Sequence, residues 1–131
     1  MPCRLRPSRL LLAKAAAAAA ALLAAAGAAA ASPTGPAAPG DAERGRQLLS
    51  HYQCGACHTI PGVASSRGRV ASSLMGFGKR SYIAGRLPNR RDLLVQWIVQ
   101  PQALVPSTTM PSMGVSPDDA RHMAAYLMEL K

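Results

Sequence analysis

The stretch Cys54-Gly55-Ala56-Cys57-His58 decides how the rest of the chain is interpreted. It is a C-x-x-C-H run, the pattern that attaches c-type haem. Two thiols at this spacing can form thioethers with the two vinyl groups on one haem edge, and the adjacent histidine can give a ring nitrogen to the iron. The small Gly55 and Ala56 let the backbone pass close to the porphyrin edge. The run therefore predicts one haem c, bound covalently through Cys54 and Cys57, with His58 as an iron ligand.

Two other kinds of site use paired cysteines, a thioredoxin-like redox pair and half of a zinc site. A structural zinc site needs four ligands, and the sequence holds no second C-x-x-C pair to complete one. A thioredoxin-like pair is flanked by strands, and little of this chain has a strand pattern. Both alternatives are therefore weaker than haem attachment.

Residues 1–31 have the organisation of an export signal. Residues 1–14 carry four positive charges, residues 15–31 are nearly all alanine, and Ala29 and Ala31 supply the small positions of a cleavage site. An uncleaved anchor is the alternative, although a short, mildly apolar alanine run spans a bilayer poorly. We therefore expect a periplasmic protein, or else one anchored on the periplasmic face of the inner membrane.

The exported part consists of a Pro/Ala/Gly linker at 32–40 and one small domain at 41–131. Loss of the signal lowers the formal net charge from +9 to +5 and removes Cys3, so that only the two motif cysteines remain. With one Trp, one Phe and three Tyr, the domain is poor in aromatic side chains for its core. We expect a buried haem to complete that core, and the haem-free chain not to fold stably.

Helices are predicted at both ends of the domain. Asp41 is the expected N-cap of a helix from Ala42 to about Tyr52. Ser116 is the expected N-cap of the last helix, with acidic residues in its first turn. An apolar stripe at helical spacing follows, made of Met123, Tyr126, Leu127 and Leu130. Gly45 in the first helix and small alanines in the last predict that the two helices cross closely.

A central helix is expected to start at Asn89, which with Asp92 resembles a capping box, and to end before Pro101. The connection from the haem motif to this helix is expected to be irregular, apart from a short extended piece at 70–74. Residues 101–116 contain three prolines and one glycine, which predicts a loop rather than a long helix. A loop of this length without secondary structure is unusual in so small a domain. Wrapping one face of a cofactor would explain it.

The second iron ligand is expected to come from this proline-rich loop. Met110 lies directly before Pro111, whose ring fixes the backbone, and a stiff loop suits a ligand that must not move. Met113, His122 or no protein ligand at all are the alternatives. His122 lies beside the apolar stripe of the last helix and is expected to be a surface histidine.

From Gly40 onward, the chain resembles the class I c-type cytochromes, specifically the small bacterial kind, and is similar to the cytochrome domains of some oxidase subunits. The resemblance is carried by Cys54-x-x-Cys57-His58, Arg80-x-x-Ile83-Ala84-Gly85-x-Leu87-Pro88-Asn89, Leu93 with Trp97-Ile98 and Pro101, Met110-Pro111, and Ala124-Ala125-Tyr126-Leu127. It implies an all-α fold of three to four helices and loops wrapped around one covalent haem. It also implies His58 and Met110 as axial ligands and a crossing of the first and last helices.

Two features concern the surroundings of the haem. The family usually has a Gly-Pro pair whose carbonyl accepts the proximal imidazole's proton, and Ala71-Ser72 stands at the matching place. A carbonyl is still available there, but the rigid proline is missing. By resemblance, Trp97 and either Arg80 or Tyr82 hydrogen-bond the haem propionates; core packing for Trp97 and a solvated basic surface for the arginine are the alternatives.

These observations predict an electron carrier and not an enzyme, because two strong ligands leave the iron no open position. We expect a periplasmic, monomeric respiratory-chain protein that takes electrons from a dehydrogenase or bc-type complex and passes them to a terminal oxidase. Its positive charge favours acidic docking sites on partners, and export argues against nucleic acid. The alternatives are a tightly bound haem subunit of a dehydrogenase or oxidase complex, or a peroxidase or gas sensor with a labile Met110.

Overall fold

The computed structural model describes residues 39–131, so the predicted export signal and most of the linker lie outside the described residues. Four helices are present in this part of the chain: α2 (Ala42–His51), α3 (Arg91–Val99), α4 (Pro101–Leu104) and α5 (Pro117–Glu129). One small antiparallel sheet, β1 (Tyr82–Ile83) with β2 (Leu87–Pro88), precedes α3. None of these helices is long and apolar enough to cross a membrane. The predicted class, three to four helices joined by loops, is confirmed.

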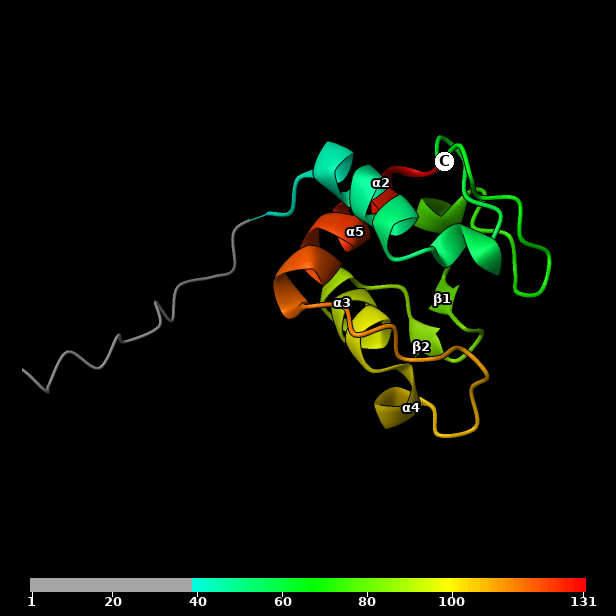
Figure 1. Ribbon diagram of the computed structural model, residues 1–131. Coiled ribbons are helices and arrows are strands. Elements are labelled where there is room, and N and C mark those ends of the chain that lie inside the picture. Colours follow the sequence, from blue (N-terminus) through cyan, green and yellow to red (C-terminus); the bar gives the residue numbers. More distant parts are fainter. Residues whose placement is uncertain (1–38) are drawn as a thin grey trace, which may run out of the picture. The chain divides into compact units, whose positions relative to one another are not determined.

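Helix α5 packs against both α2 and α3, as Figure 1 shows. The contact with α2 is very close at Gly45, because a Cβ atom there would lie 2.0 Å from the backbone oxygen of His122. Ala120 and Ala124 of α5 are completely buried. The predicted close crossing of the first and last helices is therefore confirmed.

Two of the three predicted helix caps are confirmed. The carboxylate of Asp41 accepts a hydrogen bond from the backbone N–H of Arg44 at 3.0 Å, and the hydroxyl of Ser116 accepts one from Asp119 at 3.1 Å. Each bond satisfies an N–H group that has no partner inside its helix. The starts of α2 and α5 are thus set by local sequence.

The prediction that Asn89 caps α3 is wrong. Arg90 occupies the N-cap position, and no side chain accepts a hydrogen bond from the first turn. The amide of Asn89 instead donates to the backbone oxygens of Phe77 at 2.9 Å and Arg80 at 3.0 Å. Because the side chain is turned toward the preceding loop, it cannot reach the helix N–H groups. Asn89 therefore ties that loop to the start of α3.

The connecting segments also differ from expectation. Residues 70–74 contain no strand, and the small sheet lies instead in a segment expected to be irregular. Its hairpin is closed by Ala84 and Gly85, both with positive φ angles, 51° and 69°. Within the predicted loop 101–116, Pro101 starts the single helical turn α4, a position where its missing N–H costs nothing.

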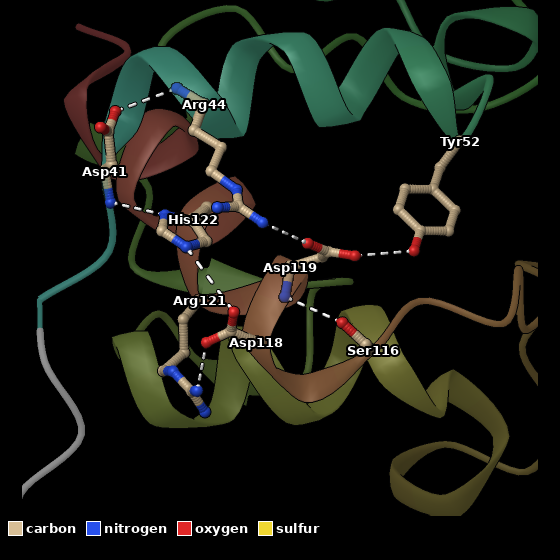
Figure 2. A network of polar contacts seen from close by, with 8 residues as sticks. All are labelled: Asp41, Arg44, Tyr52, Ser116, Asp118, Asp119, Arg121 and His122. Carbon is tan, nitrogen blue, oxygen red and sulfur yellow. Dashed lines mark hydrogen bonds and ion pairs between the residues drawn. The ribbon is translucent and has the colours of Figure 1, made fainter.

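A polar network joins both ends of α2 to the first half of α5 (Figure 2). The backbone N–H of Asp41 donates to Nδ1 of His122 at 2.8 Å, and the hydroxyl of Tyr52 donates to Asp119 at 2.8 Å. Arg44 lies 3.6 Å from the same aspartate. The side chain of His122 is 18% exposed, so this histidine is half-buried at the edge of the helix crossing. The close crossing of α2 and α5 places the backbone of Asp41, at the start of α2, over the imidazole ring of His122.

Candidate functional site

The inner faces of α2, α3 and α5 and the long loops line a partly open, apolar pocket with a cavity volume of about 60 Å³. Most of its lining side chains are aliphatic, aromatic or sulfur-containing. They are Leu49, Cys54, His58, Leu74, Phe77, Leu94, Trp97, Ile98, Met110, Met113, Val115, Met123 and Leu127. Four of the residues singled out from sequence, Cys54, His58, Trp97 and Met110, therefore meet at one place.

The C-x-x-C-H segment enters the pocket directly after α2. Gln53 adopts a left-handed conformation with φ 55°, and Cys54–Ala56 then form a 3₁₀ turn. The backbone N–H of His58 donates to the oxygen of Cys54 at 3.0 Å, so the chain folds back on itself and both side chains reach the pocket. Cys57 is half-buried and lies outside the lining residues.

Gly55 also has a role that sequence reasoning did not predict. It is buried, and a Cβ atom at this position would lie 2.5 Å from the Cα atom of Ser66. Gly68, which donates to the oxygen of Gly55 at 2.9 Å, belongs to the same loop. The glycine therefore lets the loop that follows the motif pack onto it.

The two motif cysteines form no disulfide with each other. Burial raises the pKa of the Cys54 thiol. The thiol therefore stays protonated near neutral pH and is a weak nucleophile by itself. Both sulfur atoms remain available for thioether bonds.

His58 is held by the loop that lacks the usual proline. Its Nδ1 lies 2.7 Å from the backbone oxygen of Ser72. A carbonyl only accepts hydrogen bonds, so Nδ1 carries the proton and Nε2 keeps the lone pair that binds metals. The predicted carbonyl at Ala71-Ser72 is therefore present.

Met110 and Met113 both line the pocket from the loop between α4 and α5. Met110 is half-buried, whereas Met113 is 44% exposed. The carbonyl of Met110 accepts a hydrogen bond from the side chain of Gln102 at 2.7 Å, and the hydroxyl of Ser112 donates to the oxygen of Val99 at 3.0 Å. Sequence reasoning missed Gln102 and Ser112, because neither residue type marks a site without the loop geometry.

The three residues expected near the propionates lie in different surroundings. Trp97 is buried in the pocket with 7% of its surface exposed. The guanidinium of Arg80 donates to the backbone oxygens of Ser73 and Met75 and lies 5.7 Å from the ring centre of Phe77. Tyr82 is 57% exposed, and neither it nor Arg80 lines the pocket.

The residues present fit a covalently bound haem. The pocket is apolar, as a porphyrin requires, and a cysteine and an imidazole with a free Nε2 enter it from one segment. A methionine thioether enters it from the loop before α5. Imidazole and thioether are two of the ligands that proteins use for haem iron.

Comparison with known proteins agrees with this site. The family model "Cytochrome c" matches residues 42–131 of the chain. Cytochrome c oxidase subunit 2 of Alkalihalophilus pseudofirmus (strain ATCC BAA-2126 / JCM 17055 / OF4) is 35% identical over 91 residues. The match covers 69% of this chain and 26% of that protein, so the chain spans about a quarter of the relative's length.

Proposed function

The chain belongs to the cytochrome c family, and we propose that it is a one-electron carrier with a haem c attached to Cys54 and Cys57 and ligated by His58 and Met110. The observation that carries the proposal is that Cys54, His58 and Met110 line a single apolar pocket, although Met110 comes from a distant part of the chain. When bound, the haem would supply a one-electron Fe(III)/Fe(II) couple.

The protein residues would tune and shield this couple. The hydrogen bond from His58 to Ser72 fixes the imidazole ring and makes it a stronger ligand. Met110 would add a neutral thioether, which favours the reduced iron. With both axial positions taken by side chains, no position would be left for a substrate.

The distribution of charge supports transfer between proteins. Described ion pairs join α2 and α5 or lie within the first turns of helices. Arg67, Arg69, Lys79 and Arg86, in contrast, form no ion pair with any other residue of the 39–131 segment. Such a basic stretch would steer acidic partners toward it. We propose a monomeric periplasmic carrier between a dehydrogenase or bc-type complex and a terminal oxidase.

A second candidate function is a fixed haem subunit of an oxidase or dehydrogenase complex. It is favoured by the similarity to cytochrome c oxidase subunit 2, because the segment that matches this chain is about a quarter of that subunit. The domain would then receive and pass on electrons without diffusing. Co-purification of the chain with a membrane complex in stoichiometric amounts would favour this function, whereas a free periplasmic protein would favour the carrier.

An absorption spectrum and an intact mass of the exported protein test the proposal together. We expect the mass of one haem added to the processed chain, and a long-wavelength charge-transfer band of methionine-ligated ferric iron. Replacement of Met110 by leucine is expected to abolish this band and open the ferrous form to carbon monoxide. Rapid carbon monoxide binding by the unaltered protein would contradict the carrier function.

A further inference from the structure

The loop between α4 and α5 offers two methionines to the same pocket. Met110 and Met113 both line it, and they are only three residues apart in a segment without helix or strand. Either thioether is chemically suited to the iron. What distinguishes them is how the loop is fixed at each position.

The backbone of Met110 is held on both sides. Its N–H donates to the hydroxyl of Thr108 at 3.2 Å, and its carbonyl accepts the hydrogen bond of 2.7 Å from Gln102. Met113 has no backbone hydrogen bond to another described residue, and it precedes Gly114, whose φ angle is 69°. The backbone of Met110 therefore makes two hydrogen bonds, whereas the backbone of Met113 makes none to a described residue.

The backbone that carries the Gln102 side chain is fixed by a helical turn. The side chain projects from α4, a single turn that begins at the buried Pro101 directly after α3. The N–H of Val105 donates to the oxygen of Pro101 at 2.9 Å and closes this turn. Gln102 thus connects Met110 to the end of α3, whose residues Trp97 and Ile98 also line the pocket.

Ser112 provides a second attachment on the other side of Met110. Its hydroxyl donates to the oxygen of Val99, the last residue of α3, at 3.0 Å. The last carbonyls of a helix lack partners inside it, so this bond satisfies an otherwise free acceptor. The bond from Gln102 thus holds Met110 itself, and the bond from Ser112 fixes the chain two positions after it.

We propose that Gln102 and Ser112 are positioning residues that hold Met110, and not Met113, against the pocket as the second axial ligand. The inference rests on the proposed haem ligation. It adds that the strength of the iron–sulfur bond depends on two side chains that do not touch the iron.

The test is titration of the haem-loaded ferric protein with imidazole, which competes with the thioether. Gln102→Leu and Ser112→Ala are each expected to raise the affinity for imidazole about fivefold, the equilibrium worth of one neutral hydrogen bond. Ser112→Thr keeps the hydroxyl and is expected to behave as the unaltered protein. Gln96→Leu is the matched control, because Gln96 is exposed on α3 and its side chain bonds to no other described residue.

Met113→Leu separates the two methionines, because it is expected to keep the methionine charge-transfer band that Met110→Leu loses. The inference is overturned if Gln102→Leu stays within twofold of the unaltered protein, or if Met113→Leu weakens ligation as Met110→Leu does. If the Ser112→Ala variant does not fold, the test relies on Gln102→Leu alone, because a substitution at the exposed Gln102 leaves the core intact. If the unaltered protein lacks the methionine charge-transfer band, the proposed ligation itself has failed, which is a separate result.

Discussion

At the scale of single residues, Ser72 shows how this chain replaces the proline usual in its family. The backbone oxygen of Ser72 accepts the bond from His58, and the adjacent Ala71 donates to the oxygen of Cys57 at 3.0 Å. On the other side, Arg80 donates to the oxygens of Ser73 and Met75. These bonds restrain the loop on both sides of the carbonyl. Rigidity that a proline ring supplies covalently is supplied here by hydrogen bonds.

Tyr52 and Asp119 form a pair whose contribution depends on pH. The hydrogen bond from Tyr52 lowers the pKa of Asp119, and the same bond raises the pKa of Tyr52. A lowered carboxyl pKa stabilises the fold above the unfolded pKa, and this contribution is lost as pH falls through the folded value. A raised phenol pKa stabilises the fold below the unfolded pKa, and this contribution is lost as pH rises through the folded value.

We therefore expect Tyr52→Phe to lower the free energy of unfolding at neutral pH and to lose this effect in acid. Denaturant unfolding at a series of pH values measures the difference. Tyr126→Phe is the control, because its hydroxyl donates to the oxygen of Pro61 at 2.7 Å, an acceptor that does not titrate. A Tyr52→Phe difference that stays constant down to acid pH would contradict the linkage.

At the scale of elements, the crossing of α2 and α5 organises the domain. It requires a residue without a side chain at position 45, since the backbones meet there. It also brings His122 beneath the N–H of Asp41 and Tyr52 beside Asp119 (Figure 2). The helix that leads into the haem motif is thereby fixed at both of its ends.

Gly45→Ala separates helix propensity from helix packing. Propensity alone predicts a gain of about 1 kcal/mol in a helix interior. The added Cβ would, however, lie 2.0 Å from the oxygen of His122, a backbone atom that cannot move alone. We expect a net loss of about 2 kcal/mol in the free energy of unfolding, as overpacking outweighs propensity.

Denaturant unfolding of the haem-loaded protein measures this loss. Gln96→Ala, at an exposed position of α3 whose side chain bonds to no other described residue, is the control and is expected to change stability by less than about 0.5 kcal/mol. Equal or higher stability of Gly45→Ala would show that the helices do not cross as closely as described.

At the scale of the whole molecule, the pocket occupies the place where the three long helices face one another. Phe77, Trp97 and Met123 belong both to the hydrophobic core and to the pocket lining. A core divided by such a pocket lacks contacts that only a bound group can supply. The cofactor is therefore expected to be part of the core.

We expect the chain made without attached haem to lack a cooperative thermal transition. Circular dichroism would show partial helix content that melts gradually, because α2 and α5 still carry their local caps. The haem-loaded protein is expected to melt cooperatively under the same conditions. A sharp, native-like transition of the haem-free chain would contradict a core completed by the cofactor.

The features predicted from sequence are those that depend on neighbouring residues. Asp41 and Ser116 cap helices through bonds to residues three positions away, and the cysteines and histidine of the motif lie within one turn. Apolar spacing placed α2, α3 and α5 within a few residues of their observed ends. Short separations make such bonds almost independent of the rest of the fold, so the local pattern is sufficient.

The remaining features were decided by tertiary structure, because their partners are distant in the chain. Asp41 and His122 are 81 positions apart, and Asn89 turns from the helix it was expected to cap toward a loop 12 positions earlier. Gln102 reaches Met110 only because Pro101 starts a separate turn. Hydrogen bonds need donor and acceptor within about 3 Å, and the detailed packing of helices and loops sets which groups come that close. The sequence by itself predicted a haem attachment site and determined where α2 and α5 begin. The packing of the helices and loops decided which polar groups hold the candidate ligands His58 and Met110 in place.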